Sequence, residues 1–460
     1  MKDAHITTDC GAVTNLLHEP ANAASNVEAV AMALNGGTDV EMGSTLFSEN
    51  LRNATESGLV KEEDFEKSWR RTFRVLFKSG RFDPIDSIKW SNFGVEMINS
   101  TFAQETNMEA ALQGNVLLKN DGLLPLTAGQ KIAVVGPMFD ARKSLLSSYA
   151  ADDICFDQEN TNYACITSLL EAVTENNVGG TTVGSLGVNI LDDDESNIDA
   201  AVSVARDADL VILAVGQDKS VEQEGKDRTD TALPGIQEEF AKKILALNKP
   251  VAMVMVNGGA IAIDNLVDGP NAIVEGFNPN VKGFEALGKL LFGANRWGKL
   301  PVTMYPHSYI DEQEMTNYDM SKSPGRTYKY YQGEPLFEFG HGLSYTTFDL
   351  SCDDSKDEDN SVKIKCSLSN SGDVDGDEVV MVFHSIGDNV DVDHPVPIKQ
   401  LRDFSREGVV KGGKKEVTFA FTADDIFGVI DGNGDKQVYS GTHNVVVVAG
   451  DKKVELQYTL

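Results

Sequence analysis

Four short apolar segments in the middle of the chain constrain its fold more than any other feature. Each runs for three to six residues without the alternation of apolar and polar side chains that a half-exposed strand shows. Strands that are buried on both faces have this pattern, and they occur in parallel sheets covered by helices. The segments are Ile132–Val135, Leu210–Val215, Val251–Val256 and Ala272–Val274.

A helical pattern between two of these segments supports the same interpretation. Apolar side chains recur at helical spacing from Ile236 to Leu247, after Pro234 and before Pro250,. Strands that alternate with helices indicate an α/β domain with a mostly parallel sheet. We assign residues 96–348 to this domain and its connecting segments.

The preceding part, residues 1–95, predicts a smaller α/β piece. His5–Thr8 is a short β-rich run that ends in Asp9, and Thr38–Met42 is a second strand candidate. A helix between them ends at Gly36 and Gly37,. A second, amphipathic helix has its apolar positions at Phe65, Trp69, Phe73 and Leu76.

The sequence pattern changes after Phe348, and residues 349–460 are predicted to form an antiparallel β-sandwich. Short β-rich runs are separated by turns rich in glycine and aspartate, and none has a helical period. The acidic stretch Asp353–Asp359 is the best linker or loop candidate in the chain. The expected strands are Val362–Leu368, Val379–His384, Val417–Phe421 and Val445–Val448.

Length and charge narrow the class of protein. A chain of 460 residues is long enough for two to four domains. Its net charge of −31 argues against nucleic acid or an anionic membrane as a partner, because both would be repelled. The apolar runs are too short to span a bilayer. The amino terminus has no apolar signal core, so either the chain is not secreted or its true beginning is missing.

Five cysteines allow two local disulfides without requiring them. Cys155 and Cys165 lie ten residues apart, Cys352 and Cys366 flank an acidic turn, and Cys10 is left over. Four cysteines permit three pairings, and free buried cysteines are an equal alternative. No spacing fits a metal site. The aspartate-rich turns at 373–377 and 431–435 lack the glycine and glutamate of a calcium loop, and we interpret them as turns.

Carboxylates in two segments occupy positions where α/β proteins have catalytic or ligand-binding residues. Asp9 and Cys10 follow the first strand candidate, and the loop with Glu222, Glu224 and Arg228 follows the buried run that ends at Val215. Ligands bind beyond the carboxyl ends of parallel strands. The alternatives are a strand-end turn or helix cap for Asp9, and a solvated acidic loop with an Asp227–Arg228 surface pair for the second group.

Five motifs in this order resemble glycoside hydrolase family 3, and in particular its β-xylosidase branch, where cysteine commonly follows the nucleophilic aspartate. The resemblance covers nearly the whole chain. The motifs are Thr8-Asp9-Cys10-Gly11-Ala12-Val13, Val116 to Leu126, Glu222 to Arg228, Gly298-Lys299-Leu300-Pro301-Val302-Thr303, and Phe339 to Phe348.

The resemblance implies a multidomain enzyme with a (β/α)8 barrel, an α/β sandwich and a fibronectin type III-like domain. It implies a retaining exo-glycosidase without cofactor or metal, secreted to the extracellular space, that acts on terminal xylosyl, or arabinofuranosyl, residues of oligosaccharides or aryl glycosides. Asp9 would be the nucleophile and Glu224 the acid/base, with Glu222 as its rival. Cys10 would lie near the sugar, and Arg228 would orient the loop, bind substrate or pair with the loop's carboxylates.

The chain departs from the family pattern in its first part. A (β/α)8 barrel needs roughly 250 residues, so residues 1–95 would supply only its last two strands. We therefore expect the carboxyl-terminal part of a longer enzyme. The stretches Asn278–Gly283 and Asn295–Trp297 also differ from the usual turns. A β-glucosidase of the same family, or a non-catalytic carbohydrate-interaction module, remain the alternatives.

Overall fold

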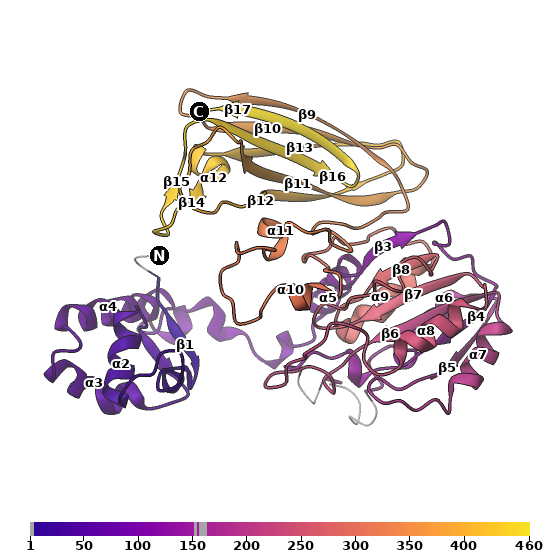
Figure 1. The fold of residues 1–460 in the computed structure, drawn as a ribbon, viewed down its shortest axis with the longest axis horizontal. Coiled ribbons are helices and arrows are strands. Elements are labelled where there is room, and N and C mark those ends of the chain that lie inside the picture. The colour runs from indigo at the N-terminus through magenta and orange to yellow at the C-terminus, as the bar shows by residue number, and fades with distance from the viewer. Residues whose placement is uncertain (1–3, 151–153, 156–162) are drawn as a thin grey trace. The chain divides into compact units, whose positions relative to one another are not determined.

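A computed structural model describes residues 4–150, 154–155 and 163–460. The chain divides into two compact units, residues 1–100 and 101–460, and each is described by itself (Figure 1). The second unit contains a wound α/β layer and an antiparallel sandwich, each with its own apolar core. Across the described ranges, no helix is both long and apolar enough to cross a membrane.

The first unit is built on a two-stranded parallel sheet. β1 (Thr7–Cys10) pairs with β2 (Val40–Met42). The strand therefore begins later than the expected His5–Thr8 and includes Asp9, because its partner strand is in register from Thr7 onwards. The helices of this unit are α1 (Ala12–Asn15), α2 (Asn26–Asn35), α3 (Leu46–Glu56) and α4 (Glu62–Lys78), with short 3-10 turns at Ile85–Ser87, Lys89–Asn92 and Val95–Met97.

A buried ion pair connects this sheet to α4. Asp39, just before β2, accepts hydrogen bonds from the Arg71 guanidinium at 2.6 and 2.9 Å and from the Ile6 N–H at 2.9 Å. Burial alone would raise the pKa of Asp39, but these hydrogen bonds and that of Ser68 outweigh it and hold the pKa below its usual value,. The pair fixes the start of both strands against the helix.

The α/β layer contains a six-stranded sheet in the order β3-β8-β7-β6-β4-β5, in which only β3 is antiparallel to its neighbour. The four apolar segments predicted as buried strands are confirmed as β4, β6, β7 and β8. β3 and β5 were not predicted, and β5 is a partly exposed edge strand without an apolar run. Bounds are β3 (Val116–Asn120), β4 (Lys131–Val135), β5 (Thr181–Ser185), β6 (Leu210–Gly216), β7 (Val251–Val256) and β8 (Ala272–Glu275).

Helices cover both faces of this sheet, which explains the unbroken apolar runs. In β6, Val211 and Leu213 face the core under α7 and α8, while Leu210 and Ile212 face the core under α6 and α9. All seven residues of β6 are buried. The helices are α5 (Thr101–Gly114), α6 (Leu169–Asn176), α7 (Ile198–Arg206), α8 (Gln237–Leu245) and α9 (Asn280–Leu291), with the short α10 (Tyr309–Glu312), α11 (Thr327–Tyr330) and 3-10 turn Lys143–Leu145.

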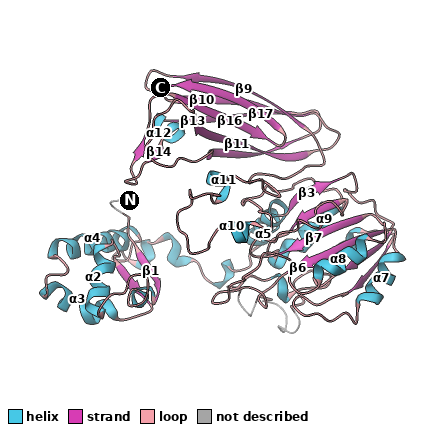
Figure 2. Cartoon of the chain, in the orientation of Figure 1, coloured by secondary structure: helices cyan, strands magenta, loops and turns pink. Residues whose placement is uncertain are grey.

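Two antiparallel sheets, with strand orders β13-β10-β9 and β12-β11-β16-β17, enclose one core in the predicted sandwich (Figure 2). The linker or loop expected at Asp353–Asp359 is wrong for its first four residues, because the edge strand β9 continues to Lys356 and pairs there with β10. Residues 357–359 do lie in the turn that follows. β12 and β17 are too polar to have been predicted. Bounds are β9 (Phe348–Lys356), β10 (Val362–Asn370), β11 (Gly376–Ile386), β12 (Gln400–Val409), β13 (Lys414–Phe421), α12 (Ala423–Phe427), β14 (Val429–Ile430), β15 (Lys436–Gln437), β16 (Thr442–Ala449) and β17 (Lys452–Thr459).

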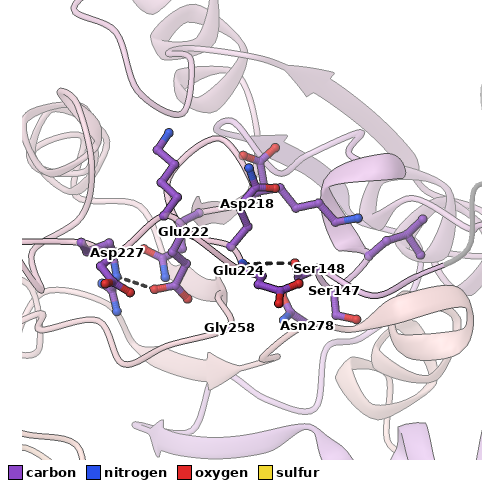
Figure 3. A pocket seen from close by; sticks show the side chains of 14 residues that line it. Ser147, Ser148, Asp218, Glu222, Glu224, Asp227, Gly258 and Asn278 are labelled. Atoms are coloured by element: carbon purple, nitrogen blue, oxygen red, sulfur yellow. Dashed lines mark hydrogen bonds and ion pairs between the residues drawn. The ribbon is translucent and has the colours of Figure 1, made fainter. Parts of the chain in front are cut away.

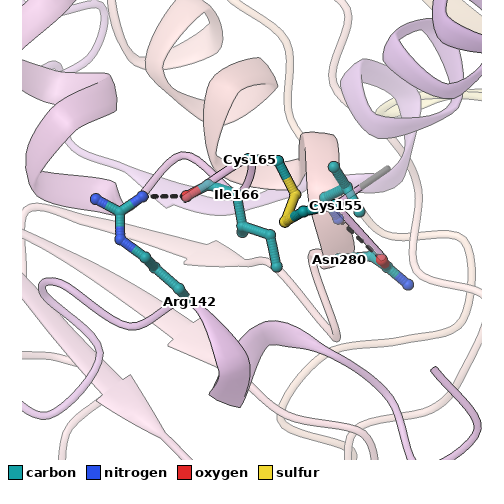
Figure 4. The surroundings of a disulfide bond; sticks show 6 residues. Arg142, Cys155, Cys165, Ile166 and Asn280 are labelled. Carbon is teal, nitrogen blue, oxygen red and sulfur yellow. Dashed lines mark hydrogen bonds between the residues drawn. A yellow bond between two sulfur atoms is a disulfide. The ribbon is translucent and has the colours of Figure 1, made fainter. Parts of the chain in front are cut away.

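Both local disulfides are present. Cys352 and Cys366 lie directly opposite each other on β9 and β10. Cys155 is bonded to Cys165 next to α9, where Arg142 donates a hydrogen bond to the Ile166 carbonyl (Figure 4). Cys10 is free and exposed. For the other four cysteines, the alternatives of free thiols or of different pairings therefore do not hold.

A polar joint connects the α/β layer to the sandwich. Arg296 Nε lies 2.9 Å from Asp377 Oδ2, and the Asn295 amide donates to the Asp375 carbonyl at 3.0 Å. Lys299 Nζ lies 2.7 Å from Glu378 Oε1, and both side chains are more than nine-tenths buried. The unusual residues at 295–297 thus contact the aspartate-rich turn at 373–377. This turn holds the sandwich against the α/β layer. Within the described ranges no cluster suited to a metal ion was found.

Two buried histidines of the sandwich form a hydrogen-bonded chain with a fixed direction. Arg402 donates from Nη2 to His384 Nδ1, His384 Nε2 lies near His443 Nδ1, and His443 Nε2 reaches the Tyr439 carbonyl, each at 2.9 Å. Because a guanidinium only donates and a carbonyl only accepts, His384 must donate to His443 and both rings are neutral. Burial, with Arg402 nearby, lowers the pKa of both histidines, that of His384 to about 3.

We expect the sandwich to lose stability in mild acid. A histidine whose folded pKa is lowered contributes stability above its ordinary pKa of about 6.5 and loses it as the pH falls, because the unfolded chain then binds the proton. For His384 this amounts to about 2 kcal/mol between pH 7.5 and pH 5. Hydrogen exchange of β11 and β16, corrected for intrinsic rates, should show less loss of protection in His384→Gln than in wild type, while His394→Gln behaves as wild type. Equal acid sensitivity in all three proteins would contradict this.

Candidate active site

A depression of about 280 Å³ lies at the carboxyl edge of the α/β sheet. Segments that follow four parallel strands line it, as sequence reasoning expected for a ligand-binding edge. Figure 3 shows the carboxylates of one loop around this depression. The lining comprises 146–148 after β4, 217–219, 222–224 and 226–228 after β6, Gly258 after β7 and Asn278 after β8.

Glu222 is anchored within this loop. One of its carboxylate oxygens lies 2.5 Å from Arg228 Nε, and the other accepts a hydrogen bond of 2.5 Å from the Gly259 N–H. Arg228 also donates to the Ala260 carbonyl at 2.9 Å. Both oxygens of Glu222 are therefore occupied, which leaves the residue poorly placed to exchange a proton with a ligand. The suggested Asp227–Arg228 pair is replaced by Glu222–Arg228.

Two glycines make room for this ion pair. A Cβ atom on Gly259 would lie 2.7 Å from Arg228 Nη2 and 2.9 Å from Glu222 Oε2, and one on Gly258 would lie 3.0 Å from Glu222 Oε1. Any residue with a Cβ atom at position 259 would displace the Glu222–Arg228 pair. Gly258-Gly259 matched no known motif in the sequence, and only the tertiary structure gives it a role.

Glu224 lies at the tip of a tight turn and is exposed. Gln223 and Lys226 close this turn with two backbone hydrogen bonds of 3.1 and 2.9 Å, and Gly225 adopts φ +74° in it. The Glu224 N–H donates to Ser148 Oγ at 3.3 Å (Figure 3). None of the described residues donates a hydrogen bond to its carboxyl group or forms an ion pair with it. The carboxyl group of Glu224 is thus free, unlike that of Glu222.

Asp218 holds the start of the same loop. Its carboxylate accepts hydrogen bonds from Ser144 Oγ at 2.6 Å, from the Ser220 N–H at 2.8 Å and from Ser220 Oγ at 2.6 Å. Lys226 donates to the Ser220 carbonyl. The loop is thereby tied at its beginning by Asp218 and at its end by Arg228, with Glu224 between them.

In the first unit, Asp9 is exposed near the end of β1. One of its carboxylate oxygens accepts a hydrogen bond of 2.7 Å from the Cys10 N–H. The helix that follows has Gly11, at φ +74°, as its N-cap, so Asp9 does not act as a helix cap. A Cβ on Gly43 would lie 2.7 Å from Cys10 Cβ, so the chain passes closely beside Cys10.

Sequence reasoning missed three buried polar residues at the carboxyl ends of buried strands, Gln217, Asn257 and Glu275, of which Gln217 lines the depression. Burial raises the pKa of Glu275 to about 8, although its carboxyl accepts from the Phe277 N–H at 2.7 Å and the Asn257 amide at 3.3 Å. A carboxyl group with a raised pKa is therefore buried at the end of β8. The signal in the sequence was a polar side chain directly after an unbroken apolar run.

Residues 115–345 match the family model described as the Glycosyl hydrolase family 3 C-terminal domain. The chain belongs to glycoside hydrolase family 3. It is 31% identical over 97% of its length to a protein of Aspergillus flavus named probable exo-1,4-beta-xylosidase, of which it spans 58%.

Solved structures agree with this assignment. A family 3 exo-beta-xylosidase in complex with a xylobiose aziridine probe superimposes with a TM-score of 0.82 at 27% identity, over 99% of this chain and 62% of that one. A beta-glucosidase of Listeria innocua, in complex with isofagomine, has the same fold, with a TM-score of 0.80 at 22% identity over 99% of this chain and 64% of that one. This family 3 chain is thus similar to xylosidases and shares its fold with a β-glucosidase.

The two glutamates should differ in their effect on the loop. Loss of the charged anchor in Glu222→Gln should weaken the loop by about 1.5 kcal/mol, and trypsin cleavage after Lys226 should become about tenfold faster because local opening is more frequent. Glu224→Gln should leave the cleavage rate unchanged. Initial rates of limited proteolysis measure both. An equal acceleration in the two variants would show that Glu224 is also an anchor.

Proposed function

We propose that this chain is part of a retaining exo-glycosidase that removes terminal β-D-xylosyl residues, and also α-L-arabinofuranosyl residues, from plant-wall oligosaccharides. One observation carries the proposal: beside an anchored glutamate, Glu224 presents an uncommitted carboxyl group to a depression at the carboxyl edge of the sheet. Membership of family 3 supports the reaction class. The relatives named xylosidases support the xylosyl preference.

In the first step, the Asp9 carboxylate attacks the anomeric carbon while the bond from that carbon to the leaving oxygen breaks. Glu224 gives its proton to the leaving oxygen, and the sugar stays bound to Asp9 as an ester. In the second step, Glu224 takes a proton from water, the water oxygen attacks the anomeric carbon, and Asp9 is released. This mechanism requires the two carboxyl groups to be about 5–5.5 Å apart in the active enzyme.

The neighbouring residues take supporting roles in this proposal. Arg228 acts by holding Glu222 and the end of the loop, so that its influence on substrate is indirect. Cys10 lies next to the nucleophile and leaves room for the sugar. Asp227 is exposed and lines the same depression as Glu224.

The proposal includes an extracellular location. Two disulfides support it, because such bonds persist mainly in oxidising compartments,. A β-glucosidase is the second candidate in the same family. A non-catalytic carbohydrate-interaction module is the third, since residues 1–100 contain two described parallel strands where a whole barrel has eight,.

The nucleophile is tested by trapping. A 2-fluoro-xyloside should add one glycosyl group to the peptide that contains Asp9, because the fluorine slows the second step more than the first. The chain is used alone and fused to the amino-terminal barrel segment of a relative. Asp9→Ala should abolish the adduct in mass spectrometry, while Asp64→Ala should retain it. Absence of turnover on nitrophenyl xyloside, arabinofuranoside and glucoside even in the fusion would reject the enzyme in favour of the carbohydrate-interaction module.

The acid/base is tested by chemical rescue in whichever form is active. Glu224→Ala should lose about 10²- to 10⁴-fold in kcat on substrates with poor leaving groups, and azide should restore turnover as a glycosyl azide product. Glu222→Ala should show no such rescue, because Glu222 only anchors the loop. Rescue of Glu222→Ala alone would reverse the two roles.

A further inference from the structure

The side chain of Gln217 lies at the floor of the depression with its hydrogen-bonding capacity unused. It is 1% exposed, yet neither its Oε1 nor its Nε2 has a partner among the described residues. Its backbone is firmly placed, since its N–H donates to the Val256 carbonyl at 2.8 Å. A buried amide without partners destabilises a fold, because it has lost its hydrogen bonds to water without replacing them.

A second buried glutamine nearby shows the contrast. The amide of Gln237 accepts from the Gly216 N–H at 2.8 Å and donates to the carbonyls of Gly216 at 2.7 Å and Ile190 at 3.0 Å. Gln237 is thus a structural bridge from α8 to the end of β6. Gln217, the next residue after Gly216, makes no such bridge and lines the depression instead.

The surroundings of Gln217 favour a neutral ligand with hydroxyl groups. Asp218, Glu222 and Arg228 are engaged within the loop, as in the contacts Glu222–Arg228 and Asp218–Ser220. Their charges are therefore not available to a ligand. The side chains of Ser147 and Asn278 line the same depression, and the described residues give neither of them a hydrogen-bond partner. An amide offers one donor and one acceptor side by side, which matches two adjacent hydroxyl groups of a sugar ring.

We propose that Gln217 binds a pair of adjacent hydroxyl groups on the leaving-group sugar of the substrate. This inference rests on the proposed function, in which Glu224 protonates the leaving oxygen. In that function the leaving oxygen lies at the Glu224 carboxyl group, and the leaving-group sugar is bonded to this oxygen. Gln217 lines the same depression as Glu224 and is therefore within reach of that sugar.

The test combines binding with stability. Gln217→Leu keeps the size of the side chain and removes the amide. We expect the affinity for xylobiose, measured by calorimetry on the full chain, to fall about tenfold or more, which corresponds to about 1.4 kcal/mol. The melting temperature should stay the same or rise, because the variant no longer buries an unpaired amide. A structural role would instead lower the melting temperature.

Gln313→Leu is the matched control. Gln313 is also buried with both amide atoms unpaired among the described residues, but it does not line the depression. Its variant should gain stability and keep the affinity for xylobiose. Unchanged affinity in Gln217→Leu would overturn the inference and show that ordered water alone occupies the floor, and a wild-type chain that does not bind xylobiose would overturn it as well.

Turnover separates this inference from the function on which it rests. In an active fusion, Gln217→Leu should lower kcat/KM for xylobiose while leaving nitrophenyl xyloside, which has no second sugar, nearly unchanged. Equal losses on both substrates would place Gln217 on the side of the attacked sugar and reject the inference. Xylobiose binding that depends on Gln217 in a fusion without turnover would support the sugar site and reject the enzyme.

Discussion

Both faces of the six-stranded sheet are covered by helices, and this determines where polar side chains can meet a ligand. Because helices cover both faces of the β4–β8 strands, the polar residues that follow these strands can reach solvent only at the edge of the sheet,. The connections after four neighbouring parallel strands, β4, β6, β7 and β8, meet there and line one depression. The arrangement of carboxylates is therefore a consequence of packing in the core: the apolar strands set the position of the loop, and the loop's own contacts set the direction of each side chain.

Within that loop, two glutamates separated by one residue have different environments. Glu222 is fixed by a guanidinium and a backbone N–H, whereas Glu224 is carried at the tip of a turn that both of its ends hold in place. Such a division is useful for acid/base chemistry, because a group that must give and take a proton cannot also be a permanent structural bond. The anchored neighbour keeps the turn in one position while the other carboxyl group remains available.

The strands that could be predicted are those whose own sequence is apolar enough to indicate a buried strand. β6 is apolar throughout and was evident, whereas the acidic end of β9 and the polar β17 form strands only because a neighbouring strand pairs with them,. The same distinction applies to the site. That the loop after Val215 lies at the ligand-binding edge follows from local sequence. That Glu222 is the anchored residue depends on Gly259, 37 residues further along the chain, and no local pattern contains that information.

The joint between the α/β layer and the sandwich has a consequence for how these domains can be exchanged. Lys299 and Glu378 are charges buried against each other, so removal of one side leaves the other as an unpaired charge in a dry environment, which is strongly destabilising. The sandwich is therefore not an interchangeable module joined by a flexible tether. A chimera between related enzymes must take the turn 375–378 and residues 295–299 from the same parent. A boundary at the start of β9 would separate these two segments and break the buried pair.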